Sequence, residues 1–145
     1  MNKFTLGVAA NEDGIVLIKK TKPAWQAGLF NFVGGKVEEG ESFPKCMVRE
    51  FREETGVVTK TSDWKYVGKM FRKGEWIVKI YATSKPAILQ AKTSTEEEVH
   101  IVNPDKFLVD TSLQLSFMTN ILTIYNFTSS LDFISNNATL NIEYK

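Results

Sequence analysis

The sequence has one cysteine, Cys46, and one histidine, His100, among its 145 residues. A single cysteine excludes an internal disulfide framework and any zinc or iron–sulfur site that needs several thiolates, and it is typical of a reducing cytoplasm. With one histidine, a histidine-rich metal site is excluded, and a Ser-His-Asp or Cys-His mechanism would have to use His100. We therefore expect a cytoplasmic protein whose chemistry depends on other side chains.

The sequence also lacks a large net charge and a long apolar segment. Eighteen lysines and arginines face 17 aspartates and glutamates, so the net charge is +1. This balance gives no reason to expect stable binding to nucleic acid or to an anionic membrane. No apolar run approaches the roughly 18 residues needed to cross a bilayer. Any binding function must therefore come from local charge, and we expect no membrane partner.

The length and the 43% hydrophobic fraction predict a single domain over residues 1–145 with a substantial core. One helix is expected at about 43–55, between a capping Ser42 and a terminating Gly56, and a second at roughly 112–127, where apolar residues recur at helical spacing. Short β-branched or aromatic segments predict strands at 4–10, 15–18, 29–33, 66–72, 76–83, 99–102 and 139–144, with loops at 19–28 and 85–97. Gly34-Gly35 is expected to end the third strand. Mixed strands with two separated helices predict an α/β or α+β sandwich.

The predicted helix at 43–55 carries three glutamates on one face. At 100° per residue, Glu50, Glu53 and Glu54 fall within an arc of roughly 100°. This acidic arc lies between the apolar face and the basic face of the helix. Like charges at this spacing repel one another on an exposed helix. A divalent cation such as Mg²⁺ would relieve the repulsion, since it prefers carboxylate oxygens together with phosphate and water. The alternative is a solvated acidic face in which Arg49 pairs with Glu53.

The spacing of charged residues and glycines around this helix favours the first interpretation. Counted along the sequence, the pattern is a glycine, five residues, a glutamate, seven residues, Arg-Glu, an apolar residue, any residue, Glu-Glu, one residue, and a glycine followed by an apolar residue. Random composition would fill these nine positions somewhere in a chain of this length with a probability on the order of 10⁻⁷. The residues that fill them are Gly35, Glu41, Arg49, Glu50, Phe51, Glu53, Glu54, Gly56 and Val57.

This pattern resembles the Nudix box, which identifies the chain as similar to the Nudix hydrolase superfamily. The resemblance implies a three-layer α/β/α sandwich with a mixed sheet, in which the box forms a loop, a helix and a second loop. Two departures stand out: Phe51 is bulkier than the usual aliphatic residue, and Val33 stands where a proline often precedes the glycine pair. Neither departure touches a charged position.

The resemblance also assigns roles to residues of the box. It implies that Glu50, Glu53, Glu54 and the Gly34 carbonyl hold Mg²⁺, for which Mn²⁺ can substitute. Arg49 is expected to orient a glutamate, and Glu41 to steady the loop, with Gly35 and Gly56 as supporting positions of the motif. Glu53 is our first choice for the general base. Many relatives use a glutamate outside the box, for which Glu98 is the candidate, although a solvated loop is an alternative for that acidic run.

Residues that contact substrate are harder to identify from the sequence. Trp25 and Phe32 lie near the glycine pair and can stack on a base, although aromatic residues in short strands are more often part of the core. Arg72 can contact a substrate phosphate, and the alternative interpretation is that it is a solvent-exposed loop residue.

The favoured activity is cleavage of a nucleoside triphosphate, including an oxidised or non-standard one, to the monophosphate and pyrophosphate. An ADP-ribose or nucleotide-sugar pyrophosphatase would share every residue of the box. A decapping-type enzyme is disfavoured by the missing basic tract, and a non-catalytic nucleotide sensor by the complete set of glutamates. We expect a small nucleotide as partner and a monomer or homodimer.

Overall fold

The structure is a computed structural model that describes residues 1–107 and 120–145. The strands are β1 (Asn2–Asn11), β2 (Gly14–Lys19), β3 (Phe30–Asn31), β4 (Val33–Lys36), β5 (Lys65–Arg72), β6 (Trp76–Thr83), β7 (Glu98–Val102) and β8 (Leu140–Glu143). The α-helices are α1 (Phe43–Thr55), α2 (Pro104–Phe107), α3 (Ile121–Thr128) and α4 (Leu131–Asn136). Three 3₁₀ turns complete the described elements, namely η1 (Ala24–Gln26), η2 (Thr61–Asp63) and η3 (Pro86–Gln90).

β1 is the strand around which the mixed sheet is built. It runs parallel to β6 over a register that extends from Asn2↔Trp76 to Ala9↔Thr83, and antiparallel to both β4 and β2. The β1–β2 and β5–β6 hairpins that the sequence predicts are confirmed. At the first turn the Asp13 backbone N–H donates to Asn11 Oδ1 at 2.8 Å, a local bond that favours chain reversal.

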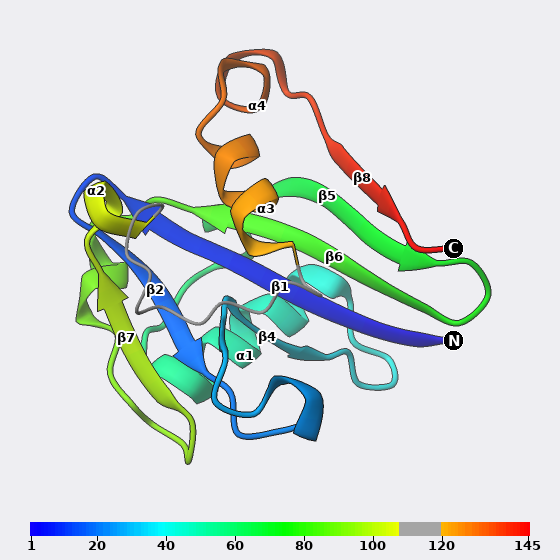
Figure 1. The fold of residues 1–145 in the computed structure, drawn as a ribbon, viewed down its shortest axis with the longest axis horizontal. Helices are drawn as coiled ribbons and strands as arrows, with labels where there is room; N and C mark the ends of the chain where they lie inside the picture. Colours follow the sequence, from blue (N-terminus) through cyan, green and yellow to red (C-terminus); the bar gives the residue numbers. More distant parts are fainter. Residues whose placement is uncertain (108–119) are drawn as a thin grey trace.

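Helices cover both faces of this sheet (Figure 1). Side chains alternate along β1, so Thr5 and Gly7 lie toward α1 whereas Leu6 and Val8 lie on the opposite face. On the α1 side, buried Met47, Phe51, Trp64 and Tyr81 belong to one core cluster. On the other side, Ile121 and Ile124 of α3 pack with Leu6, Val8, Phe107 and Phe133 in a second cluster. The fold is therefore the predicted α/β/α sandwich with a mixed sheet.

α1 has the bounds that its sequence predicts, because both of its ends are fixed locally. Ser42 Oγ accepts a hydrogen bond from the Lys45 N–H at 3.3 Å, and Pro44 occupies the first turn, where no N–H is needed. Gly56 has φ +77°, and its N–H donates to the Arg52 carbonyl at 2.8 Å. A left-handed residue at this point ends the helix.

Three features of the fold differ from the prediction. The expected strand at 29–33 is divided into β3 and β4 at Phe32, and β4 continues through the glycine pair because residues 33–36 pair with β1. The short helices α2 and α4 occupy segments for which the sequence predicts no helix. Of the helix expected at 112–127, α3 covers the last part, and residues 112–119 lie outside the described residues. Among the helices described, none is long and apolar enough to span a membrane.

Phe51, the residue that departs from the aliphatic pattern, anchors α1 to the turn that follows it. Its ring is fully buried and meets Trp64 edge to face, with centroids 5.2 Å apart. Trp64 is held in turn by a hydrogen bond of 2.8 Å from its Nε1–H to Thr59 Oγ1. We predict that Phe51→Leu lowers the free energy of unfolding by about 1–2 kcal/mol, through the loss of buried volume and of the ring contact. Urea denaturation followed by circular dichroism measures this, with the partly exposed Phe71→Leu as control. An equal loss in both variants would contradict the role of the Phe51–Trp64 pair.

Candidate active site

The Arg49 guanidinium joins the loop before α1 to the acidic face of the helix. Its Nε and Nη2 groups donate to the two Glu41 carboxylate oxygens at 2.7 and 3.0 Å, and Nη2 also donates to the Lys36 carbonyl at 3.0 Å. Nη1 donates to Glu50 Oε1 at 2.9 Å and to Glu53 Oε2 at 3.3 Å. Such a planar fork suits two-point binding of a carboxylate. Arg49 therefore fixes the loop and two glutamates in one network.

The Glu41 carboxylate is stabilised in its charged form by this contact. The hydrogen bond from Arg49 lowers its pKa from 4.5 to about 2, although partial burial opposes the shift. Glu41 Oε1 also accepts a hydrogen bond from the Glu38 N–H at 3.1 Å. Glu41 thus closes the loop on itself as well as on the helix.

Glu50 lies directly against Gly35 of β4. A Cβ atom at position 35 would overlap the Glu50 carboxyl group, so only glycine permits this approach. Burial raises the pKa of Glu50, and the Arg49 charge opposes that shift. The glycine pair and the helix therefore meet at a carboxylate, and Gly34 lies beside it in the same strand, opposite Leu6 of β1.

Glu54 is the most perturbed carboxyl group of the helix. Burial raises its pKa from 4.5 to about 8, nearby Lys20 lowers it, and the charges of Glu50 and Glu97 raise it further. Its Oε2 atom is buried and has no hydrogen-bond partner among the described residues. Burial of an unpartnered polar atom is costly, so this oxygen indicates a missing ligand. Glu53, in contrast, is exposed, and its Oε2 atom lies 3.3 Å from Arg49 Nη1.

Outside the box, the structure brings Glu97 rather than Glu98 to the glutamate cluster. The Glu97 side chain is 7% exposed and accepts hydrogen bonds from Lys20 Nζ at 3.0 Å and from the Thr21 N–H at 2.6 Å. Burial alone would raise its pKa, but these donors outweigh it and the pKa lies below its usual value. Glu98 is 62% exposed and contacts His100 Nε2 at 3.0 Å.

The sequence gives no clear signal that separates these two glutamates. Glu97 has the same parity as Val99, which packs against the core of the α1 face, but Ile101 also has this parity and is 41% exposed. Alternation along β7 is therefore irregular, and the contacts with Lys20 and Thr21 are what distinguish Glu97.

Cys46 is buried beside the cluster and is paired with Thr5 Oγ1 at 3.4 Å. Burial raises the pKa of its thiol to about 11, so the group stays protonated near neutral pH. Cys46 is therefore a buried, neutral thiol, and a neutral thiol is a poor metal ligand.

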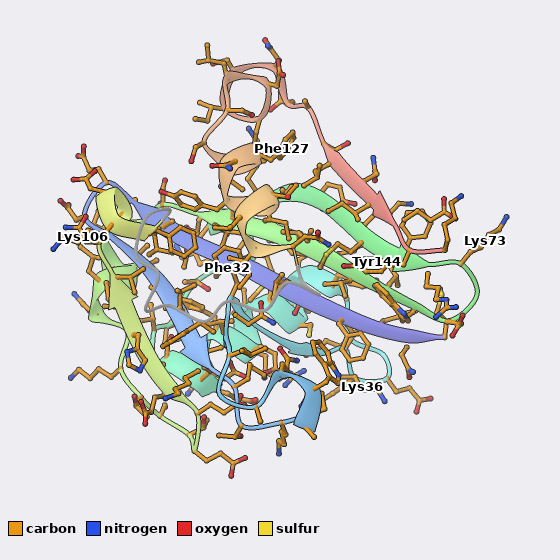
Figure 2. All side chains as sticks on the ribbon, viewed as in Figure 1. Phe32, Lys36, Lys73, Lys106, Phe127 and Tyr144 are labelled. Atoms are coloured by element: carbon orange, nitrogen blue, oxygen red, sulfur yellow. The ribbon has the colours of Figure 1, made fainter. Side chains whose placement is uncertain are left out.

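A cavity of about 560 Å³ opens beside the glycine pair on the face of the sheet opposite α1. Figure 2 labels three of its lining residues: Phe32 and Lys36 come from the segment that contains β4, and Tyr144 follows β8 near the C-terminus. The predicted Trp25 lines it and is 56% exposed, and Phe32 lines it while being 1% exposed. Arg72 does not line it and instead pairs with Glu75 at 2.9 Å in the β5–β6 turn. The remaining lining residues are Phe4, Thr5, Leu6, Lys20, Pro23, Gln26, Asn31, Gly34, Gly35, Met70, Trp76 and Val78.

A second hollow of similar volume lies along the outer side of α1. Its lining includes Arg49 and Glu53, together with Lys45, Val48, Arg52, Thr61 and Ser94. No aromatic residue lines it, so it offers no surface for stacking a base. The cavity beside the glycine pair is therefore the better candidate for a nucleoside site.

The carboxylates fit a hard divalent cation. Buried, unpartnered Glu54 Oε2 lies on the same helix face as Glu50, with Glu97 near it. Within residues 1–107 and 120–145, no three carboxyl, thiol or imidazole groups converge as a closed metal site would require. Mg²⁺ usually takes one or two protein carboxylates and completes its shell with water and substrate phosphates. The donor set therefore suits an ion that is held jointly with a substrate.

Comparison with known proteins places these features in a family. The NUDIX domain model matches residues 4–118. The chain is 34% identical over 64 residues to the CTP pyrophosphohydrolase of Escherichia coli K12, covering 44% of this chain and 47% of that protein. It is 44% identical over 45 residues to the NAD-capped RNA hydrolase NudC of Mycobacterium tuberculosis H37Rv, covering 31% of this chain and 14% of that protein. These alignments span less than half of either relative.

Solved structures resemble the fold over nearly the whole chain. A MutT structure from a study of Aliivibrio salmonicida and Vibrio cholerae superposes with a TM-score of 0.69 at 20% identity, over 88% of this chain and 97% of the other. The Escherichia coli ORF135 protein superposes with a TM-score of 0.63 at 25% identity, over 93% of each chain. Together with the family match over residues 4–118, the sandwich and the complete box show that the chain belongs to the NUDIX domain family.

Proposed function

We propose that this protein is a metal-dependent hydrolase that cleaves nucleoside triphosphates to the nucleoside monophosphate and pyrophosphate. The observation that carries the proposal is the buried, unpartnered Oε2 atom of Glu54, on the same helix face as Glu50, which lies against Gly35 in the wall of an aromatic cavity. A hard cation would account for the unpartnered oxygen, and a nucleoside would account for the aromatic cavity. A relative named for CTP pyrophosphohydrolase activity supports a nucleotide as substrate.

In this proposal Glu50, Glu53, Glu54 and the Gly34 carbonyl would hold Mg²⁺ or Mn²⁺, with Glu97 as a nearby carboxylate. A bound ion would neutralise the phosphate chain and lower the pKa of a coordinated water. Because Glu50 lies against Gly35 in the cavity wall, an ion held by these residues would bring the phosphates to the rim of the cavity, with the nucleoside on the sheet face.

The protein residues have distinct tasks around the phosphate. Glu53 is exposed, and its Oε2 atom lies 3.3 Å from Arg49, so its carboxylate could accept a proton from the attacking water. Arg49 positions Glu50 and Glu53, and Glu41 positions Arg49. We assign Glu97, instead of Glu98, as the glutamate outside the box that belongs to the site, because its charge raises the pKa of Glu54.

We further propose that residues 1–145 form one domain that acts in the cytoplasm as a monomer or homodimer. The single buried cysteine supports a reducing environment. An ADP-ribose or nucleotide-sugar pyrophosphatase, a hydrolase of capped RNA and a non-catalytic sensor would differ in substrate, and the product experiment below separates them.

Substitution of Glu54 tests the metal site through two opposite effects. We predict that Glu54→Gln lowers kcat at least about 100-fold, because it removes a charged ligand without changing the packing face of α1. In metal-free protein the raised pKa of Glu54 means that stability falls as pH rises from 4.5 to about 8. Glu54→Gln has no carboxyl group at this position and does not lose stability in this way. In EDTA at pH 8 we therefore expect its thermal midpoint to exceed that of the wild type.

Adding Mg²⁺ should reverse this order of stability, since only the wild type has the full ligand set. Thermal melts with EDTA or Mg²⁺, beside a kinetic assay, make both measurements. Full hydrolysis by the wild type in excess EDTA, or a variant that is less stable in both buffers, would contradict the site.

Substitution of Glu41 tests the positioning network. We predict that Glu41→Gln lowers kcat about tenfold or more, because Arg49 loses its two-point partner while the metal ligands stay. The lowered pKa of Glu41 means that its contribution to stability is present above pH 4.5 and is lost as pH falls toward 2. Acid unfolding of the variant should therefore be less steep in that window. Glu39→Gln, an exposed neighbour, is the control, and identical behaviour of the two variants would refute the network.

Product analysis tests the reaction itself. We expect GTP, UTP, CTP and ATP with Mg²⁺ to give monophosphate and intact pyrophosphate, separated by ion-exchange chromatography. Orthophosphate as the primary product would contradict the mechanism. A strong preference for ADP-ribose, a nucleotide sugar or capped RNA would replace the substrate class, and tight binding without turnover would indicate a sensor.

A further inference from the structure

The cavity contains a buried pair of side-chain amides that the proposed chemistry at the phosphate does not use. Gln26 lies in η1 and Asn31 in β3, with 8% and 5% of their surfaces exposed, and both line the cavity. Asn31 Nδ2 donates to Gln26 Oε1 at 3.2 Å. Other walls of the same cavity are mainly aromatic and aliphatic. A buried amide pair in an apolar pocket is suited to orienting a ligand by hydrogen bonds.

The backbone determines which way each amide points. The Phe32 N–H donates to Asn31 Oδ1 at 2.8 Å, which leaves Asn31 Nδ2 as the group that faces Gln26. Because Nδ2 is a donor, Gln26 must present Oε1 to it, and the Gln26 Nε2 group is directed elsewhere. Gln26 Nε2 makes no hydrogen bond to another described residue. It is also not one of the side-chain atoms that are fully buried without a partner. Two N–H donors of Gln26 therefore remain available to a molecule in the cavity.

The backbone around Gln26 is held at both sides. Its N–H donates to the Pro23 carbonyl at 3.0 Å, and its carbonyl accepts from the Leu29 N–H at 3.0 Å. Lys20, a neighbouring cation on the cavity wall, is occupied by Glu97 at 3.0 Å. The Gln26 backbone is thus fixed, and the contact with Asn31 sets the orientation of its amide.

We propose that Gln26 selects nucleobases that carry a carbonyl group, at position 6 of a purine or position 4 of a pyrimidine, over bases that carry an amino group there. Guanine, hypoxanthine, uracil and thymine present an acceptor at this position, whereas adenine and cytosine present a donor. An amino group would face the Gln26 N–H groups donor to donor and leave both unpaired in a buried site. Asn31 acts as a positioning residue, since it sets the orientation of the Gln26 amide. The inference rests on the proposed function for its nucleotide substrate.

Inosine and adenosine nucleotides provide the sharpest comparison, because their bases differ only in the carbonyl or amino group at position 6 and in the proton on the adjacent N1. We expect the wild type to have about tenfold higher kcat/KM for ITP than for ATP, and likewise for UTP over CTP. Isothermal calorimetry of IMP and AMP in EDTA measures the same preference without turnover or metal.

Two variants should invert the preference by different routes. Gln26→Glu still accepts from Asn31 Nδ2 but presents a carboxylate oxygen to the base, which favours an amino group. Asn31→Asp still accepts from the Phe32 N–H but can no longer donate, so Gln26 should turn its own Nε2 toward Asp and present Oε1 to the base. For both, the ITP/ATP and IMP/AMP ratios are expected to fall from about ten to below one. Gln90→Glu and Asn136→Asp make the same chemical changes at exposed positions outside the cavity, and should keep the wild-type ratios.

The outcomes separate this inference from the proposed function. Cleavage of triphosphates with equal use of ITP and ATP, or with ratios unchanged in Gln26→Glu and Asn31→Asp, overturns the role of Gln26 and leaves the proposed function standing. Tighter binding of IMP than of AMP by a wild type that cleaves no triphosphate supports the role of Gln26 and overturns the proposed function. If either variant fails to fold, as judged by circular dichroism, the other still decides the inference, and Gln26→Met, which should bring the ratio to about one, replaces the lost variant.

Discussion

The geometry of the candidate site depends on the hydrogen bonds of one guanidinium group. Arg49 donates to Glu41 in the loop, to the Lys36 carbonyl at the end of β4, and to Glu50 and Glu53 on the helix. These bonds hold the loop before α1 against the helix. Lysine could not replace this contact, because its single ammonium lacks the planar fork that binds two partners at once. The acidic face remains ordered before any cation is bound because Arg49 offsets part of its repulsion.

Features that depend on neighbours in the sequence are the ones that the sequence predicts well. α1 begins after Ser42 and ends before Gly56 because both caps act within a few residues of the helix. The clustering of Glu50 and Glu54 follows from helical periodicity alone. The hairpins follow from short polar turns between β-branched segments, and the structure confirms both.

Features that depend on distant partners could not be predicted in the same way. The sequence predicts that the glycine pair ends a strand. β4 nevertheless continues through it, because β1, about thirty residues earlier in the chain, supplies the hydrogen bonds. Glu97 differs from Glu98 through donors at Lys20 and Thr21, far earlier in the chain. The orientation of the Gln26 amide requires Asn31 and a backbone N–H, and no local pattern encodes it.

The pleat of β1 divides the work of the site between its two faces. Phe4 and Leu6 line the cavity beside the glycine pair, whereas Gly7 lies against Met47 of α1. Thr5, between them, contacts Cys46 of α1 and also borders the cavity. Substitutions at the even positions can therefore reshape the cavity during evolution without disturbing the helix that carries the glutamates. An inserted residue has no such freedom, because it would exchange the two faces along the rest of the strand. Descendants of this sequence can thus acquire new substrates by point mutation in β1, but not by a change in its length.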